Sequence, residues 1–149
     1  MKYCLKTYNS NNKGAVIEIF RSNMPAYFDP SELAPFQKFL ENIKGKYFVC
    51  ELNDVVIGAG GYCEEEKGEA RICWLMIHNS KHGNGAGRYM MQAFYDKIVE
   101  QKTFDRITLK TTQHTDKFYK TLGYETTYFE KDHWLKGMHL YFMEKVLMN

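Results

Sequence analysis

Three glycines in five residues separate an apolar segment from an amphipathic one, and this arrangement limits the possible folds of the chain. The stretch NSKHGNGAGRYMMQAFYDKIVE covers residues 79–100, with glycines at positions 83, 85 and 87. Glycine costs about 1 kcal/mol relative to alanine inside a helix, so Gly83 and Gly85 are expected just before a helix begins. That helix is predicted from apolar residues at offsets of three and four, namely Ala86, Met90, Ala93, Phe94 and Ile98. The sequence thus predicts a strand over 69–77, a glycine-rich turn and a helix.

The start of this helix is a candidate anion site. Backbone N–H groups there lack partners within the helix, and the helix dipole adds about half a positive charge. Lys81, His82 and Arg88 supply further donors, so a phosphate or pyrophosphate is the expected ligand. A P-loop would need Lys-Ser or Lys-Thr after the glycines, and a dinucleotide site would need G-x-G-x-x-G, whereas the spacing here is G-x-G-x-G. The alternative is a glycine-rich connection that only turns the chain.

The remaining sequence alternates between strand-like and helix-like segments. Strands are predicted over residues 3–8, 46–52, 55–65, 69–77, 105–112, 124–130 and 138–147. Helices are predicted over residues 14–22, 31–45 (capped by Ser31 and ended by Gly45), 86–100 and 116–124. Asn53-Asp54 is expected to form the tight turn of a hairpin, and KDHWLKG (131–137) a loop. This order predicts an α/β fold with a mixed central β-sheet flanked by helices, in a single domain over residues 1–149.

Two motifs resemble those of the GNAT N-acetyltransferase superfamily. MIHNSKHGNGAGRYMM is similar to the family's coenzyme loop Q/R-x-x-G-x-G/A, and QHTDKFYKTLGYE is similar to its N-x-x-A-x-x-F-Y-x-x-x-G-F helix. Phe118, Tyr119, Gly123 and Tyr124 stand in register with the second motif. The resemblance extends to the order of elements over nearly the whole chain. The chain departs from the motifs at His82 (Gln or Arg in the family), at Gln113 (Asn) and at Asp116 (a small residue).

The resemblance implies acetyl-CoA as co-substrate and a GNAT-like fold. The coenzyme-binding residues that it implies are Leu75, Ile77, His82, Gly83, Asn84, Gly85, Ala86, Gly87, Arg88, Gln113 and Tyr119. It also implies transfer of the acetyl group to a primary amine by direct attack on the thioester. The acceptor is a small-molecule amine or a peptide amine, and the sequence leaves its identity open. A non-catalytic acyl-CoA-binding sensor or interaction module is the alternative.

The sequence offers one clear candidate for the general acid and one weak candidate for the general base. The resemblance places Tyr119 opposite the coenzyme sulfur, where a phenol with a pKa near 10 can protonate the leaving thiolate as general acid; otherwise it is a core tyrosine, one of eleven in the chain. Some members of the family carry a carboxylate base on the strand over 69–77, and the corresponding position here is Arg71, which cannot act as a base. In a regular strand Glu69, Arg71, Cys73, Leu75 and Ile77 share one face, so Glu69 is a substitute base. Otherwise Glu69 is a solvated acid of the hairpin. In that case the amine loses its proton through water and backbone carbonyls, and no single residue acts as base.

Charge and composition bear on the partners, the metal content and the compartment of the protein. The net charge of +2 gives no reason to expect nucleic acid as a partner, and the chain has no apolar run of about 18 residues that would cross a membrane. The histidines lack metal-ligand spacing, so no metal is expected. Four cysteines without a C-x-x-C pair and the lack of a signal peptide favour a cytoplasmic protein. Tyr27 and Phe28 in the segment NMPAYFDPSEL are either core residues or part of a lid over the acceptor, and the C-terminal hairpin offers an edge for a homodimer.

Overall fold

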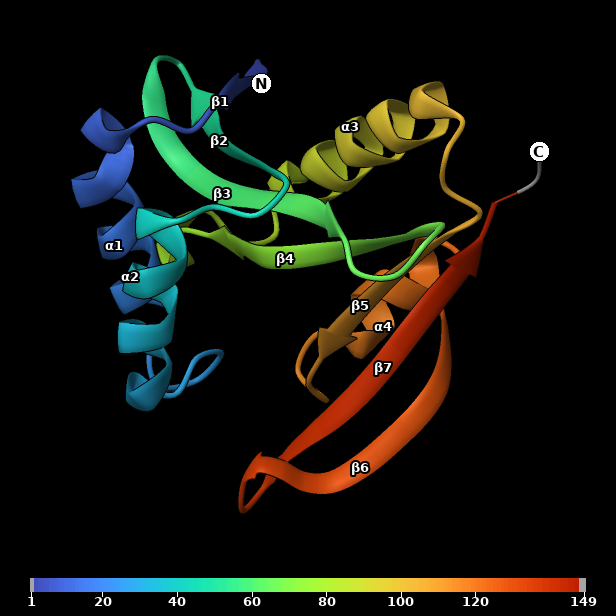
Figure 1. Ribbon diagram of the computed structural model, residues 1–149. Helices are drawn as coiled ribbons and strands as arrows, with labels where there is room; N and C mark the ends of the chain where they lie inside the picture. The colour runs from blue at the N-terminus through green and yellow to red at the C-terminus, as the bar shows by residue number, and fades with distance from the viewer. Residues whose placement is uncertain (1, 148–149) are drawn as a thin grey trace. The chain divides into compact units, whose positions relative to one another are not determined.

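The computed structural model describes residues 2–147 and confirms the predicted α/β class (Figure 1). The strands are β1 (Tyr3–Thr7), β2 (Lys46–Leu52), β3 (Val55–Glu64), β4 (Glu69–Ile77), β5 (Arg106–Thr111), β6 (Glu125–Leu135) and β7 (Met138–Val146). The α-helices are α1 (Lys13–Ser22), α2 (Leu33–Glu41), α3 (Ala86–Gln101) and α4 (Asp116–Thr121). Short 3₁₀ turns lie at η1 (Ser10–Asn12), η2 (Pro30–Glu32) and η3 (Asn79–Lys81).

The strands form one mixed sheet in the order β1-β2-β3-β4-β5-β7-β6. Pairing of β4 with β5 is parallel and joins Glu69–Arg71 to Arg106–Thr108, whereas β1 with β2, β2 with β3, β5 with β7 and β6 with β7 pair antiparallel. The chain forms two compact units, one of residues 2–63 and 73–97 and one of residues 64–72 and 98–147. Strand β4 and helix α3 each contribute residues to both units.

Helices cover both faces of the sheet in the first unit. Val49 of β2 packs in a cluster with Phe20 of α1 and Phe36 of α2. The adjacent residue Phe48 points the other way, because side chains alternate along a strand, and its ring lies 5.8 Å from that of Phe94 in α3. The buried face of α3 is the predicted one for Ala86, Met90, Phe94 and Ile98. The periodicity of the sequence therefore identified the side of α3 that contacts the sheet.

Strand β4 is not regular, and the prediction that its odd-numbered residues share one face is wrong. Trp74 has φ 46°, a backbone conformation that bulky residues rarely adopt. Cys73 and Trp74 both pack against the α1–α2 cluster, whereas Leu75 faces Gly60 and lies on the side of α3. An extra residue of this kind is a β-bulge, and it shifts the alternation by one position. The Trp74 carbonyl is held by the hydroxyl of Tyr47, which donates a hydrogen bond of 2.8 Å.

Three predicted boundaries are also corrected, and one turn is confirmed. Asp29 rather than Ser31 caps the segment before α2, because its carboxylate accepts from the Ser31 N–H at 3.0 Å. Helix α2 ends at Glu41, so Gly45 is not its stop and instead lies before β2 with φ 80°. The predicted loop 131–137 belongs mostly to β6, whose pairing with β7 is irregular between Glu130 and Leu135. Asn53 and Asp54 form the expected tight turn with φ 51° and 68°.

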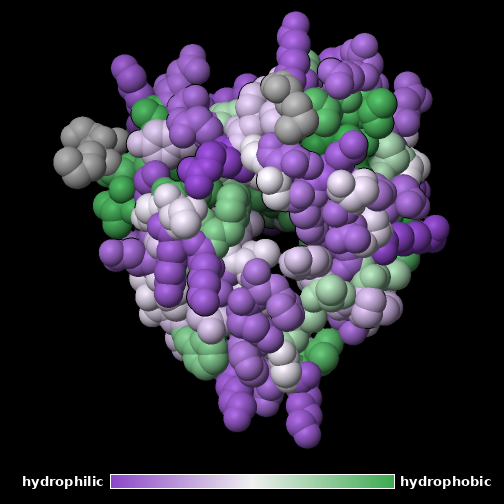
Figure 2. Space-filling view, turned by 180° about the vertical axis from the view of Figure 1, so that it is seen from behind, coloured by the Kyte–Doolittle hydropathy of each residue, from purple (hydrophilic) through white to green (hydrophobic). Residues whose placement is uncertain are grey.

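The surface is predominantly polar on the face drawn in Figure 2, where hydrophobic residues form separate small patches. Of the helices in residues 2–147, none has the length and apolar character that crossing a membrane requires. Strand β6 ends the sheet and exposes the side chains of Tyr128 and Phe129. The homodimer expected at this hairpin stays a prediction.

Candidate active site

The glycine-rich connection between β4 and α3 has the backbone conformation that requires glycine. Gly83 and Gly85 have φ 79° and 86°, in the left-handed region that other residues rarely adopt. A Cβ atom built on either residue would meet no atom within 4 Å, so these glycines do not make room for a neighbouring part of the protein. The open space lies directly in front of the backbone at the start of α3.

The backbone N–H groups of this connection are available to a ligand. In the described part of the chain, the N–H groups of Gly83, Asn84, Gly85, Ala86 and Gly87 donate no hydrogen bond, and the helical pattern begins with Tyr89 N to the Gly85 carbonyl at 3.0 Å. The carbonyl of Asn84 accepts a hydrogen bond of 2.6 Å from the hydroxyl of Tyr3. Five consecutive donors at the amino end of a 16-residue helix are therefore available to an anion.

His82 is oriented by the end of β4. Its Nε2 lies 2.8 Å from the carbonyl oxygen of Ile77, and because a carbonyl only accepts, Nε2 carries a proton. The ring of Tyr27 meets the imidazole edge-on, with 5.1 Å between the ring centres. This leaves Nδ1 as the ring nitrogen that is not committed to Ile77. The prediction that His82 contacts a phosphate stays a prediction, restricted to that nitrogen.

Two further predicted coenzyme residues, Leu75 and Ile77, lie after the bulge on β4. A Cβ on Gly60 would come within 2.8 Å of Leu75 Cδ1, and one on Gly58 would come equally close to Ile77 Cδ1. These glycines of β3 thus admit the two side chains of β4. Leu75, Ile77 and residues 82–88 all belong to the first unit, whereas Glu69, Gln113 and Tyr119 belong to the second.

Tyr119 is a buried phenol on α4. Its side chain is 9% exposed, and its ring packs at near right angles against those of Phe118 and Tyr124. Burial raises the pKa of Tyr119 well above the usual range of a tyrosine, and no hydrogen bond or charge from the described residues contributes to this shift. The phenol is therefore protonated at neutral pH, as a general acid must be before it acts.

Gln113 connects the start of the α4 segment to the β6–β7 hairpin. Its Nε2 donates to the carbonyl of Gly137 at 2.6 Å, and its Oε1 accepts from the backbone N–H of His139 at 3.1 Å. Both ends of the amide are thus engaged by the protein. A contact of Gln113 with the coenzyme stays a prediction, and the observed role of the side chain is to hold the hairpin.

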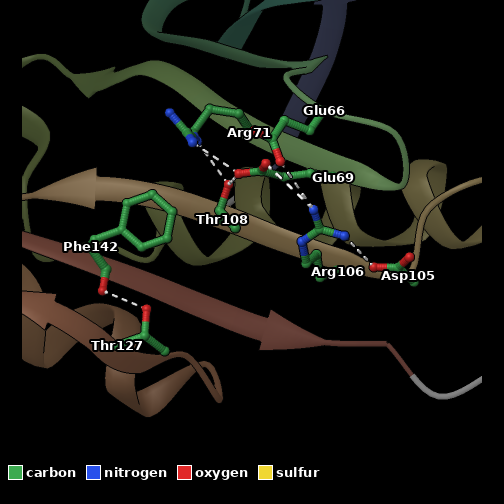
Figure 3. A network of polar contacts seen from close by, with 8 residues as sticks. All are labelled: Glu66, Glu69, Arg71, Asp105, Arg106, Thr108, Thr127 and Phe142. Carbon is green, nitrogen blue, oxygen red and sulfur yellow. Dashed lines mark hydrogen bonds and ion pairs between the residues drawn. The ribbon is translucent and has the colours of Figure 1, made fainter.

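Glu69 lies in a network of cations and hydroxyls within the second unit (Figure 3). The residue is 5% exposed. Its carboxylate accepts hydrogen bonds from Arg71 at 2.9 Å and Thr108 at 2.6 Å, and Arg106 lies 3.7 Å from its second oxygen. Burial raises the pKa of Glu69, but the hydrogen bonds of Thr108 and Arg71 and the two guanidinium charges outweigh it, so the net shift is downward. A carboxylate so occupied is a weak proton acceptor, which makes Glu69 a poor candidate for the base.

Replacement of Glu69 by glutamine distinguishes a role of this carboxylate in stability from a role as the catalytic base. Because the pKa of Glu69 is lowered on folding, its stabilisation is present above the unfolded value of about 4.3 and is lost as the pH falls through the folded value. We expect Glu69→Gln to lower Tm at pH 7, with the difference from wild type shrinking below about pH 4.3. Turnover per folded molecule should stay within about threefold of wild type, whereas a large loss of turnover together with loss of the low-pH limb of the pH–rate profile would identify Glu69 as the base.

Several residues that support the site have no signal in the sequence. Tyr3 contacts the loop from 81 positions away, and Thr108 and Arg106 reach Glu69 from a different strand. Long-range contacts of this kind leave no local periodicity. In residues 2–147, no cluster of three or more His, Cys, Asp or Glu side chains is arranged to bind a metal.

Comparison with solved structures identifies the fold of the chain. The chain is similar to ribosomal-protein-alanine N-acetyltransferase from Brucella melitensis (16% identity, TM-score 0.79, covering 97% of this chain and 99% of that one). It is also similar to yncA from Salmonella typhimurium, solved with its cofactor acetyl-CoA (15%, 0.75, 100% and 96%), and to aminoglycoside 6'-N-acetyltransferase from Enterococcus faecium (13%, 0.76, 98% and 98%). At these identities the similarity establishes a GNAT fold.

Sequence comparison then establishes the family. The acetyltransferase (GNAT) domain family matches residues 7–147, nearly the whole chain. A search of curated proteins gave no match. The chain therefore belongs to the GNAT acetyltransferase family, as the two motifs predicted.

Proposed function

We propose that this protein transfers the acetyl group of acetyl-CoA to a primary amine by direct attack of the amine on the thioester. The observation that carries the proposal is the set of five N–H groups from Gly83 to Gly87, which donate no hydrogen bond within the described residues. The open space in front of Gly83 and Gly85 fits a bulky anion such as the coenzyme pyrophosphate. Structural relatives include one that holds acetyl-CoA, and the family match supports the same co-substrate.

The bound coenzyme would supply an activated acetyl group and a thiolate leaving group. The neutral amine nitrogen forms a bond to the thioester carbon and the carbon–sulfur bond breaks. The nitrogen then loses one proton to become the amide, and the thiolate takes one proton. In this proposal the proton for the thiolate comes from the Tyr119 hydroxyl, which burial keeps protonated, and the phenolate regains a proton equivalent to the one that the nitrogen releases. A thiol has a pKa of about 8.5, so its thiolate leaves readily and needs only modest help from an acid.

The amine must lose a proton before it can attack. An alkylamine with a pKa of about 10.4 is neutral in only about one molecule in a few thousand at pH 7, so reaching the neutral form costs about 4 to 5 kcal/mol. Glu69 is occupied by Arg71 and Thr108, and Arg71 itself stays protonated. We therefore infer that water and backbone carbonyls carry this proton to solvent, with no single carboxylate as base.

The names of the structural relatives specify different amine acceptors. One is a ribosomal-protein-alanine N-acetyltransferase and another an aminoglycoside 6'-N-acetyltransferase. Peptide amines and small polar amines are therefore both included as acceptors in the proposal for this chain.

A coenzyme-release assay with a panel of amines tests the proposal. Thiol release from acetyl-CoA is followed with amino-terminal peptides, polyamines, amino acids and aminoglycosides, and we expect at least one class to accelerate it by more than tenfold over water alone. In parallel, acetyl-CoA should raise Tm, whereas NAD and ATP at equal concentration should not. A shift in Tm with no accelerating amine would favour a non-catalytic coenzyme-binding module, and no shift at all would contradict the coenzyme site.

A further inference from the structure

The carbonyl oxygen of Ile77, at the end of β4, connects the glycine loop to helix α1. It accepts two hydrogen bonds, one from Asn23 Nδ2 at 2.9 Å and one from His82 Nε2 at 2.8 Å. A carbonyl oxygen has two lone pairs, so both of its acceptor positions are filled. One donor comes from the end of α1 and the other from the residue just before Gly83. The direction in which the chain leaves β4 is therefore fixed from both sides.

Asn23 is well suited to hold the Ile77 carbonyl in place. It is 3% exposed, one of the few buried polar residues among residues 2–147, and its Nδ2 also donates to the Ile19 carbonyl at 2.8 Å in the last turn of α1. An amide nitrogen carries two protons, so one bonds α1 and the other bonds β4. Aspartate lacks both donors and leucine lacks any polar group, although both resemble asparagine in size. The Asn23 amide thus joins the two carbonyls.

The neighbouring residue makes a second connection to the same loop. Ser22 Oγ accepts a hydrogen bond from the backbone N–H of Asn79 at 3.0 Å and donates to the Ile19 carbonyl at 2.7 Å. The backbone carbonyl of Asn23 accepts from the N–H of Tyr27 at 2.9 Å, and the Tyr27 ring contacts His82. Two consecutive residues at the end of α1, together with the segment that follows, thus hold the connection between β4 and α3.

We propose that Asn23, assisted by Ser22, is a positioning residue for the coenzyme loop. By fixing the Ile77 carbonyl and the Asn79 N–H, it sets the path of residues 78–85 and thereby the direction of the five available N–H groups. The inference rests on the proposed function of that loop as the pyrophosphate site. Asn23 itself touches neither the five N–H groups nor the open space before Gly83 and Gly85, so its effect is transmitted through the backbone and His82.

The test compares Asn23→Leu with wild type for binding of coenzyme A by calorimetry, at a temperature well below both melting points. We expect coenzyme A to bind about 5- to 50-fold more weakly, the scale of one or two lost hydrogen bonds. Leu40→Ala is the matched control, because Leu40 is a buried residue of α2 whose truncation destabilises the same unit without touching the loop. The control should lower Tm at least as much and leave coenzyme affinity within twofold of wild type.

A truncated co-substrate separates positioning from general loss of structure. S-acetylpantetheine has the same thioester but no pyrophosphate, so kcat/KM for it should be similar in wild type and Asn23→Leu, while kcat/KM for acetyl-CoA falls. Equal losses with both co-substrates, or coenzyme affinity within twofold of wild type, would overturn the proposal. If Asn23→Leu does not fold, Ser22→Ala takes its place with a smaller expected loss of about 2- to 10-fold. Failure of wild type to bind coenzyme A would instead refute the proposed function.

Discussion

Gly85→Glu is expected to abolish binding of acetyl-CoA while the protein remains folded. The Cβ of the new side chain would enter open space, so no steric clash with the protein follows, but the carboxylate would compete with the phosphate for the N–H groups of residues 83–87. The loss of even one phosphate hydrogen bond should exceed about 1 kcal/mol, and charge repulsion adds to it. Calorimetric titration with coenzyme A should show at least a hundredfold weaker binding.

Gly137→Glu is the matched control for this substitution. Gly137 has φ 84°, close to the 86° of Gly85, and its Cβ would also meet no atom within 4 Å. Both variants therefore pay the same backbone strain and gain the same charge, but only one lies in the glycine loop. Gly85→Ala measures the strain without the charge. Coenzyme affinity of Gly85→Glu within about twofold of wild type would contradict the pyrophosphate site.

Features set by short stretches of sequence were predicted well. The turn at Asn53-Asp54 follows from two residues that tolerate positive φ, and the buried face of α3 follows from its periodicity. The loop glycines were likewise identified by type and spacing, since only glycine readily adopts the conformation of Gly83 and Gly85. In each case the information lies within a few residues of the feature that it determines.

Features set by contacts distant in sequence were missed. A tryptophan gives no indication of positive φ, so the bulge at Trp74 was not expected, and its carbonyl is satisfied by Tyr47 from another strand. The polar composition of residues 131–137 is typical of a loop, yet Asp132 keeps the hairpin together by accepting from the Gly137 N–H at 2.7 Å. The occupation of Glu69 by Arg71 and Thr108 depends on the β4–β5 register, which single-strand patterns do not give.

For Tyr119, too, one feature follows from the local sequence and another from contacts distant in sequence. Its motif is local and places it on a short helix, as observed, but its burial depends on residues that pack around α4. Burial alone is compatible with a core tyrosine and with a catalytic one. The raised pKa keeps the hydroxyl protonated under both interpretations, so the two differ only in whether removing the oxygen affects turnover or stability.

Tyr119→Phe removes that oxygen and retains the ring contacts with Phe118 and Tyr124. If the phenol protonates the thiolate, we expect kcat to fall by about 10- to 1,000-fold, the lower end reflecting how readily a thiolate leaves unaided. Coenzyme affinity should change much less, because the proton is transferred only as the carbon–sulfur bond breaks. The measurements are kcat with a saturating amine, the Kd of coenzyme A and a melting curve. A core tyrosine would instead show altered Tm with normal turnover per folded molecule. Unchanged kcat, with chemistry shown to be rate-limiting by single-turnover kinetics, would remove Tyr119 from the mechanism.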